Sequence, residues 1–422
     1  MPRLGLAYRP FNNNTTALRA GFGIYYTVPD GFSQSQATAS PPFAFYQQVV
    51  NLPPNVPFGQ PFTYNTLWPA SSPQGVGCCG HDIRNRDPRM QQWTVSIEHQ
   101  LVKNMVLTLE YLGNRGQQLP LTLLINEPTL PNASQLPALL ANPALSAGAA
   151  ATRAPFAGIG QGYGLWSNIG FSTYNAMNVK VEKRFAQGFV LSSVYTWAKA
   201  LDNASAEQQF PSSTYNLGLS KSYSDYDHPQ RFVTSWVYKL PLGEKRFAPR
   251  NAALKKVISG WESSGIATFE SGSPFSVFMG TDTSFRSTGT DFPNATGKPV
   301  FSDIRATNGI YLTPANFTAP PFGQIGSFPR NGVRGPGVLN FDLGLMKNTQ
   351  VHEKVNAQFR AEMFNAFNHA QFNIGNQNLA FGLLPPPGGT TQPVIQYTAA
   401  SSFGRASARG TRIIQFGLKL VF

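Results

Sequence analysis

Residues 412–422 read RIIQFGLKLVF and end the chain. From Ile414 onward, one parity of this stretch is wholly apolar and consists of Ile414, Phe416, Leu418, Leu420 and Phe422. The other parity includes Gln415, Gly417 and Lys419. Alternation with a period of two is typical of a β-strand whose two faces meet different surroundings. The apolar face needs an apolar neighbour, which is either a second layer of the same protein or the hydrocarbon of a membrane.

The composition indicates a polar protein that carries few charges. Only 13% of the 422 residues are Asp, Glu, Lys or Arg, about half the usual share of roughly 25%. The mean hydropathy is nevertheless −0.20, and 13% of the residues are aromatic. No apolar run approaches the roughly 18 residues that a membrane-spanning helix requires. These features together favour a transmembrane β-barrel, whose strands show one face to lipid and the other to a wet lumen.

The net charge of +13 raises the question of a nucleic-acid partner. The lysines and arginines are scattered along the chain, and no zinc spacing or RNA-binding signature accompanies them. We therefore expect no nucleic-acid partner. We interpret the positive charge as belonging to the lumen, turns and loops, where it faces an anionic outer leaflet.

Catalytic and metal-binding patterns are missing from the sequence. There is no GxSxG or HExxH motif, and the glycine-rich run at 158–164 lacks GxGxxG spacing. The only two cysteines, Cys78 and Cys79, are adjacent, so they form neither a disulfide framework nor a four-ligand zinc site. Either a strained vicinal disulfide or two free thiols fits them. The sequence predicts no enzyme activity, no metal and no cofactor.

Eleven segments show strand-like alternation, and most are close to the length that crosses a bilayer at a tilt. In chain order they are Arg3–Arg9, Leu18–Thr27, Gln91–Leu101, Met105–Tyr111, Asn175–Lys183, Phe189–Ala198, Arg231–Leu240, Trp261–Glu270, Val338–Met346, Val355–Met363 and the terminal stretch. Phe43–Val50 is a further possible strand without alternation, and Gln135–Ala151 has room for a short helix. The pattern predicts an all-β protein built from an antiparallel sheet.

The connections between these segments alternate between short and long. We expect short ones near 10–17, 102–104, 184–188, 241–257 and 347–354, and long ones over 28–90, 114–174, 199–230, 271–337 and 364–411. Structureless connections longer than about 15 residues are uncommon in compact domains. Outer-membrane barrels, in contrast, combine tight periplasmic turns with long outer loops.

The strand count is odd, whereas closed bacterial single-chain barrels have an even number of strands. An incomplete sheet would also leave two unpaired edges in lipid, at a large cost in free energy. The start, MPRLGLAYRP, lacks the pattern of a secretory signal. We therefore expect residues 1–422 to be the carboxy-terminal half of a 22-stranded barrel, with its signal peptide and preceding part missing.

Several segments resemble the mid-barrel of TonB-dependent outer-membrane receptors, in particular the Oar-like group. These segments are PRLGLAYRPF at 2–11, LRAGFGIYY at 18–26, DPRMQQWTVSIEHQL at 87–101, YNAMNVKVEKRF at 174–185, SYSDYDHPQRFVTSWVYKLP at 222–241, GWESSGIATFESGSPF at 260–275 and FRAEMFNAFNHAQF at 359–372. The terminal FGLKLVF resembles the strand that the outer-membrane assembly machinery recognises, with Phe422 as its end signal. The resemblance covers nearly the whole chain.

This resemblance implies a receptor that takes up a scarce or large solute through a plugged barrel. It implies outer-membrane lipid and the assembly machinery as partners, and an energy-transducing inner-membrane complex as a partner of the full-length protein only. No plug domain or energy-coupling box is found in the sequence, so we do not expect this chain alone to transport by that mechanism.

Loop aromatics are the candidate ligand contacts, although plain packing within the loops also accounts for them. They are Tyr163, Trp166, Tyr215, Tyr223 and Tyr226. A different set, on the apolar parity near strand ends, is expected to form interfacial girdles. It comprises Tyr8, Tyr26, Trp93, Tyr111, Trp197, Trp236 and Tyr238.

Two other functions remain open from the sequence. The same sheet could form a passive porin or a surface adhesin. A soluble, secreted, β-rich carbohydrate-binding or hydrolytic protein is the third alternative, in which the aromatic residues would pack a core instead of facing lipid.

Overall fold

Most of the chain is placed in a computed structural model. The structure describes residues 2–11, 15–27, 79–141, 150–156, 162–186, 188–206, 209, 211–243, 249–288, 291–352, 355–375, 377–379, 381–384, 394–397 and 403–421. The possible strand at Phe43–Val50 lies outside these residues. Within them, no helix combines the length and the apolar character needed to cross a membrane.

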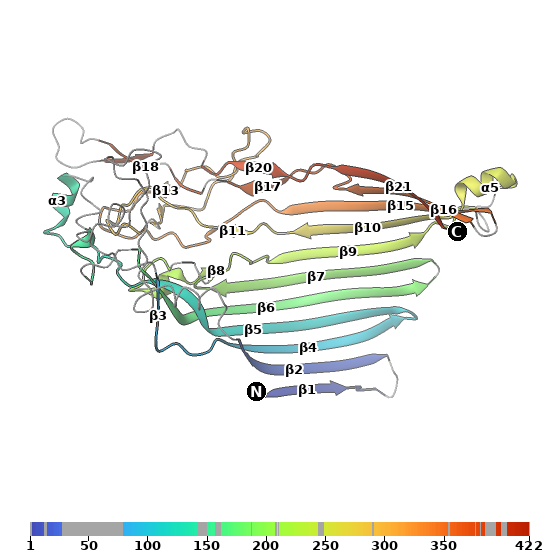
Figure 1. Cartoon of the computed structure of the whole chain (residues 1–422), viewed down its shortest axis with the longest axis horizontal. Coiled ribbons are helices and arrows are strands. Elements are labelled where there is room, and N and C mark those ends of the chain that lie inside the picture. The colour runs from blue at the N-terminus through green and yellow to red at the C-terminus, as the bar shows by residue number, and fades with distance from the viewer. Residues whose placement is uncertain are drawn as a thin grey trace, which may run out of the picture.

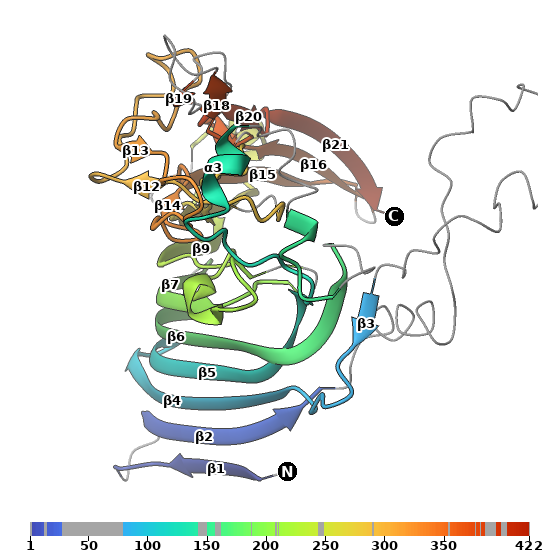
Figure 2. The same ribbon diagram turned by 90° about the vertical axis from the view of Figure 1, so that its left-hand side faces the viewer.

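One large antiparallel sheet contains all the long strands, and neighbours in the sheet are neighbours in the chain (Figure 1). In order they are β1 (Arg3–Tyr8), β2 (Thr16–Tyr26), β4 (Arg89–Val102), β5 (Met105–Leu124), β6 (Gly164–Ala186), β7 (Phe189–Asp202), β9 (Gln230–Lys239), β10 (Trp261–Glu270), β15 (Val338–His352), β16 (Val355–Phe364) and β21 (Ile413–Val421). The sheet bends into an open curve with β1 and β21 at its two ends (Figure 2). All eleven predicted strands are confirmed.

Several strands are longer than the sequence pattern predicts: β7 continues to Asp202, β15 continues to His352, and β5 and β6 are extended most. Residues 114–174 were expected to be one long connection, but β5 continues to Leu124 and β6 already begins at Gly164. Those extensions pair with each other, with register shifts between Gln117 and Pro120. The shifts interrupt the period of two, which is why alternation does not reveal this part of the strands.

The cross-strand register sorts side chains into transverse rows. One row across the middle of the sheet is apolar in all nine strands from β1 to β15 and runs Tyr8, Leu18, Ile97, Leu109, Val179, Tyr195, Phe232, Phe269 and Leu339. The row one residue further along, on the opposite face, runs Arg19, Ser96, Glu110, Asn178, Thr196, Arg231 and Glu270. The predicted division into an apolar and a polar face is therefore confirmed.

Hydrogen bonds link neighbouring strands along the polar row. The Asn178 side-chain amide donates to the Glu110 carboxylate at 2.9 Å, and the Thr196 hydroxyl donates to the Asn178 carbonyl at 2.8 Å. Further along, the Arg231 guanidinium lies 2.7 Å from the Glu270 carboxylate. Polar groups on this face thus satisfy one another across adjacent strands.

Glycines on the apolar face make room for the large aromatic residues. Trp93 is paired with Gly113, and a Cβ at that glycine would lie 2.2 Å from the indole ring. Trp236 covers Gly265 in the same way, at 2.4 Å. The other aromatics expected in the girdles include Tyr8, Tyr26, Tyr111 and Trp197, and all four are exposed.

The short connections lie at one end of the sheet. The connection at 240–260 holds helix α5 (Ala252–Ile258), whose first turn is capped by the side chain of Asn251. At the other end of that helix, the Lys347 ammonium donates to the carbonyls of Lys256, Val257 and Ser259 at 2.7–2.9 Å. One lysine from the sheet therefore satisfies carbonyl groups at the helix end.

The long connections gather at the opposite end of the sheet (Figure 1). Their elements are β3 (Cys79–His81), α3 (Leu136–Ala141), η2 (Leu217–Ser220), β8 (Ser222–Tyr223), β11 (Pro274–Phe275), β12 (Asn294–Ala295), β13 (Phe317–Thr318), β14 (Val333–Arg334), β17 (Gln371–Ile374), β18 (Phe381–Leu384), β19 (Val394–Tyr397) and β20 (Ala406–Arg409). Helix α3 confirms the short helix predicted within Gln135–Ala151. Here β3 pairs with β6, and β8 pairs with β7.

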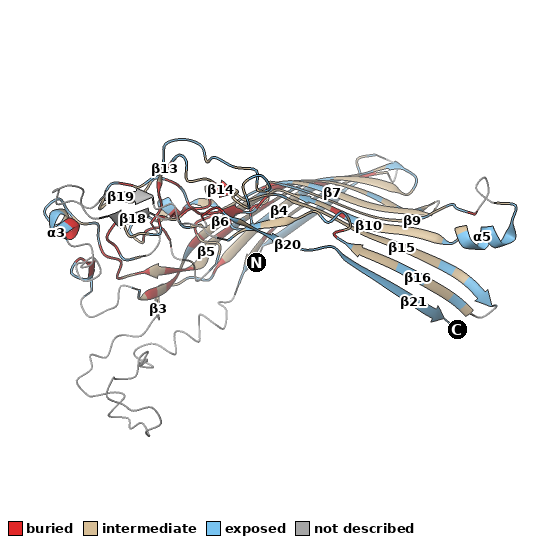
Figure 3. Ribbon diagram, turned by 90° about the horizontal axis from the view of Figure 1, so that it is seen from above, coloured by how far each residue is buried: buried red, intermediate tan, exposed pale blue. Residues whose placement is uncertain are grey.

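The main hydrophobic core of the described residues lies in these connections and not in the sheet. Its members are Phe275, Val277, Leu312, Phe317, Phe328, Val333, Leu379 and Phe403. Figure 3 shows buried residues concentrated at this end, whereas the far ends of the strands are half-buried or exposed. We call the described residues of connections 125–163, 203–229, 271–337 and 365–412 the loop cap.

Candidate functional site

Three arginines of connection 271–337 link separate parts of the loop cap, and one of them, Arg330, also links the cap to strand β7. Arg286 is only 1% exposed and forms ion pairs with Glu127 and, at 3.2 Å, with Asp291. The Glu127 carboxylate also accepts hydrogen bonds from Ser213 and Thr214. Because each of these buried charges is paired and hydrogen-bonded, the cluster avoids the cost of an isolated buried ion.

The other two arginines reach the end of strand β7 and the connection that follows it. Arg330 forms ion pairs with Asp202, the last residue of β7, and with Asp225 at 3.3 Å. Arg334 pairs with Asp227, whose carboxylate also accepts a hydrogen bond from the backbone of Ala200. These contacts hold the loop cap in a fixed position over the sheet.

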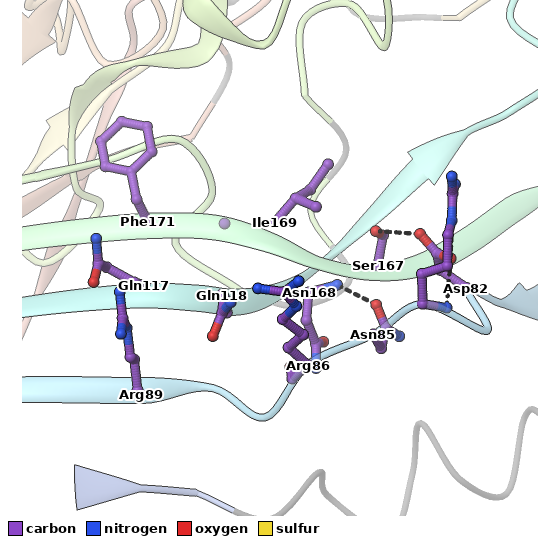
Figure 4. A pocket seen from close by; sticks show the side chains of 12 residues that line it. Asp82, Asn85, Arg86, Arg89, Gln117, Gln118, Ser167, Asn168, Ile169 and Phe171 are labelled. Carbon is purple, nitrogen blue, oxygen red and sulfur yellow. Dashed lines mark hydrogen bonds and ion pairs between the residues drawn. The ribbon is translucent and has the colours of Figure 1, made fainter. Parts of the chain in front are cut away.

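A polar cavity of about 450 Å³ lies where the extended parts of β5 and β6 meet the start of β4 and the segment before it (Figure 4). Three guanidinium groups line it, from Arg84, Arg86 and Arg89, together with the carboxylate of Asp82. The remaining lining residues are Asn85, Gln117, Gln118, Ser167, Asn168, Ile169, Gly170 and Phe171. The excess of cationic groups favours an anionic ligand.

The segment that connects β3 to β4 forms one wall of this cavity, and hydrogen bonds attach it to β6. The Asn85 amide donates to the Trp166 carbonyl at 3.1 Å and accepts from the Asn168 backbone at 2.7 Å. The Asn168 amide donates to the Arg86 carbonyl at 2.9 Å. The arginines are thus presented by a segment whose backbone is held in place.

The carboxylate of Asp82 is ionised at neutral pH. It accepts a hydrogen bond from the backbone N–H of Arg84 at 2.9 Å, and this bond is the main cause that lowers the pKa of Asp82. The Arg84 guanidinium at 3.3 Å and the Ser167 hydroxyl at 3.2 Å act in the same direction. Asp82 therefore offsets Arg84, which leaves the charges of Arg86 and Arg89 in excess.

A second cavity, of about 290 Å³, adjoins the first and shares Gln117 and Phe171 with it. Arg115 and Lys221 supply its positive charges. The Lys221 ammonium lies 5.8 Å from the centre of the Phe171 ring. The two cavities together form one cationic surface on adjacent strands, which we call the cationic strip and define by Arg84, Arg86, Arg89, Arg115 and Lys221.

The five aromatic residues predicted as ligand contacts are held in separate sets of contacts. Trp166 is 4% exposed and stacks on His81 in β3, and Tyr163 lies beside Gly80. The Tyr215 hydroxyl donates to the carbonyl of Glu127 at 2.6 Å, within the loop cap. The structure therefore does not gather these residues into one cavity.

Tyr223 and Tyr226 lie on the connection after β7. Tyr223 lines a cavity of about 510 Å³ with Trp197, Lys199 and Arg334, and both cationic groups approach its ring within 6 Å. Tyr226 is 71% exposed. Phe422 and Cys78 lie outside the described residues; Cys79 begins β3, and its side chain also lies outside the description.

The alternation pattern of the sequence does not reveal the arginines of the cationic strip as a group. Arg84, Arg86 and Arg89 follow each other closely in HDIRNRDPR at 81–89, which is a visible signal of a local positive charge. Arg115 joins them only because β4 pairs with β5, which sets Gln91 opposite Arg115. Among the described residues, no group of three His, Cys, Asp or Glu side chains could hold a metal ion.

A family model described as an outer membrane beta barrel domain matches residues 1–415. The chain belongs to the outer membrane β-barrel domain family. This membership confirms the predicted fold class and the predicted location in the outer membrane, and it separates the chain from soluble secreted proteins. In this barrel domain, the exposed apolar rows of the sheet face lipid.

Solved structures provide a second comparison. The outer membrane transporter YddB from Escherichia coli aligns with a TM-score of 0.48 and 10% identity, over 99% of this chain and 40% of that protein. The ferric preacinetobactin receptor BauA from Acinetobacter baumannii gives 0.42 and 9%, over 100% and 36%. FpvA from P. aeruginosa, solved with pyoverdines, gives 0.40 and 11%, over 100% and 32%.

This barrel domain spans about a third to two fifths of the length of these proteins. No curated protein matches the chain.

Proposed function

We propose that this outer-membrane barrel domain is the carboxy-terminal half of a 22-stranded TonB-dependent receptor that takes up a solute without catalysing a reaction. The observation that carries the proposal is the sheet order. Eleven strands follow one another in sequence, and β1 and β21 each have one strand neighbour among the described residues. Unpaired strand edges are costly in lipid, and barrels of this kind have even strand numbers, so a second set of strands would close the sheet.

The loop cap supports a receptor function more specifically than it supports a passive pore. Buried ion pairs and a hydrophobic core hold the long connections in one arrangement over the end of the sheet. A surface fixed in this way is pre-organised for binding, because little conformational entropy is lost when a ligand arrives. The resemblance of the strand segments to the Oar-like group points to the same class of receptor.

We further propose that the solute contacts aromatic residues of the outer connections. Of the five predicted residues, Tyr215, Tyr223 and Tyr226 are exposed, so a solute could reach them directly. Tyr163 is half-buried and Trp166 is buried, so these two would act through the shape of the surface. The energy-transducing inner-membrane complex would act on the full-length protein, and the assembly machinery would bind the terminal strand, including Phe422.

Cryo-electron microscopy of the full-length protein in nanodiscs tests the architecture. A barrel of 22 strands, with β1 and β21 each paired to a strand from the other half, is the expected result. A barrel closed by these eleven strands alone would overturn the proposal. Conductance of the same protein in planar bilayers distinguishes a receptor from a passive porin. A porin should give a steady open current, and a gated receptor should not.

A further inference from the structure

The apolar parity of the sheet changes character toward the loop cap. Next to the central apolar row lies a row with Val95, Tyr111, Met177 and Trp197. The next row contains Trp93, Asn175 and Lys199. The row after it contains Gln91, Arg115 and Thr173, and the last row contains Arg89, Gln117 and Phe171. The lipid-facing surface therefore passes from apolar rows, through a row that mixes Trp93 with polar and cationic residues, to rows that contain arginines, within a few residues.

The height of this change matches the edge of a bilayer. From Leu109 in the central row to Arg115 is six residues along β5, which is about 20 Å of strand and about 15 Å of depth at a tilt near 40°. That depth is half of a hydrocarbon core of about 30 Å. Six residues in the other direction on β7 lead from Tyr195 to Phe189, at the short-turn end of that strand. The central row thus lies near mid-membrane, and Arg115 lies at headgroup level.

The cationic strip has unused hydrogen-bonding capacity at this height. In the described part of the chain, neither the buried Nε of Arg89 nor the side-chain oxygen of Gln117 has a hydrogen-bond partner. The two residues are paired across β4 and β5, and their side chains lie close together in Figure 4. The single carboxylate that lines the strip, Asp82, is already bound to Arg84. The Nε–H of Arg89 is a donor that an anionic group with several acceptor oxygens would complement, whereas the Gln117 oxygen is an acceptor that a hydroxyl donor would complement.

We propose that the cationic strip binds the phosphorylated headgroup of an outer-leaflet lipid, whose acyl chains lie on the apolar rows below it. A soluble anion would use the guanidinium groups alone. A lipid also uses the aromatic and aliphatic rows that continue from Arg115 toward Leu109 on the same parity. Anionic lipid surfaces attract basic side chains at this position, and aromatic side chains favour the boundary just beneath them.

The test uses the full-length protein that contains this domain, folded in zwitterionic detergent micelles. The probes are bis-phosphorylated lipid A, the same lipid after removal of its phosphates, and inorganic phosphate. The native protein is expected to bind the phosphorylated lipid tightly and in a salt-sensitive manner, and to bind the dephosphorylated lipid more weakly. Each surface cation contributes about a fivefold gain in affinity for an anionic lipid, so Arg89→Gln with Arg115→Gln is expected to lower it roughly 25-fold.

The matched control removes two charges at the other end of the sheet, with Lys103→Gln and Lys183→Gln. This variant is expected to bind the phosphorylated lipid within twofold of the native chain. An equal loss in both double variants would overturn the proposal, and so would equal binding of the two lipids by the native chain. Competition by inorganic phosphate at the concentration of the lipid would identify a soluble-anion site and overturn it as well.

Two measurements guard against a variant that fails to fold. The comparison of phosphorylated with dephosphorylated lipid needs only the native chain. The charge-conserving pair Arg89→Lys with Arg115→Lys is expected to retain most of the affinity, because lysine keeps the positive charge while it loses the guanidinium fork. The outcome depends on the outer-membrane location and not on solute uptake, so it is independent of the receptor proposal.

Discussion

The sheet and the loop cap are stabilised in opposite ways. In the sheet, large apolar side chains stay exposed, as Phe416 and Leu418 in β21 do at 72% each, and their surroundings are lipid. In the loop cap, Phe275, Val277 and Leu312 are buried among themselves. The apolar side chains of this one chain are therefore removed from water in two ways. Those of the strands contact the lipid around the sheet, whereas those of the cap pack against one another.

The largest effect is expected from breaking the buried charge cluster of the cap. Arg286→Met removes the partner of Glu127 and Asp291, and leaving buried carboxylates unpaired costs about 3–5 kcal/mol. Limited proteolysis and thermal unfolding should show a destabilised cap, while the strands remain folded in micelles. Arg305→Met, at an exposed position of the same connection, is the control and should change stability by about 0.5 kcal/mol or less. A cap as resistant as the native one would contradict this role of Arg286.

The second prediction addresses the lipid-facing side of the comparison. Leu109→Arg puts a charge in the central apolar row and should destabilise the folded protein in vesicles by about 2–4 kcal/mol. Urea titration of the vesicle-inserted protein measures this change. The neighbouring Thr108→Arg lies on the polar face and should be tolerated. Equal effects at the two positions would mean that both faces meet the same medium.

A smaller effect is expected from the pH dependence of the cap. Burial and the nearby Asp291 raise the pKa of Asp282 above its ordinary value of 3.8. A raised pKa means that the folded cap holds this proton more tightly than the unfolded chain does. That contribution to stability is present below pH 3.8 and is lost as the pH rises through the raised pKa.

The variant Asp282→Asn should lack this component of the pH dependence. Thermal unfolding of the cap measured from pH 3 to pH 7 should therefore give a native-minus-variant difference that declines as the pH rises. A difference that rises with pH would show that the hydrogen bonds from Ser284, Arg286 and Ser287, which favour the ionised form, prevail over burial.

The smallest effect is expected at an exposed ion pair on the polar face of the sheet. Arg19 lies 3.2 Å from Glu98, and their side chains are 60% and 34% exposed, respectively. Such pairs contribute about 0–1 kcal/mol, because water and salt screen them. A double-mutant cycle with Arg19→Gln and Glu98→Gln should give a coupling energy in this range that shrinks with added salt. A coupling energy as large as the value of about 3–5 kcal/mol expected for Arg286 would mean that ion pairs on the polar face of the sheet are as stabilising as those buried in the cap.

The same contrast explains how far the sequence could be interpreted. Strands such as β2 and β16 were predictable because residues that face lipid and residues that face the lumen alternate along them with a period of two. Where register shifts near Gln117 disturb that period, the extensions of β5 and β6 could not be recognised. The terminal stretch could be predicted from its alternation alone. Its apolar face meets lipid, so no packing contact with a distant residue is needed to account for that face.

The cap and the cationic strip could not be derived in this way. Arg286 and Glu127 are 159 positions apart, and no local pattern connects them. Phe317, Phe328 and Phe403 lie in Pro- and Gly-rich stretches that resemble ordinary loops, although their rings pack edge to face. Arg115 shares a surface with Arg89 only through the pairing of β4 with β5. Strand pairing and long-range contacts determine the loop cap and the cationic strip. Neither produces a repeating pattern that could be recognised in a single sequence.

The three arginines Arg286, Arg330 and Arg334 all belong to the one connection between β10 and β15. Their partners, Glu127, Asp202 and Asp227, belong to earlier parts of the chain, and two of the pairs span 128 and 159 positions. These ion pairs can form only when the connections that follow β5, β7 and β10 lie side by side. Protease resistance of the loop cap would therefore report that these parts of the chain, which are far apart in the sequence, have come together.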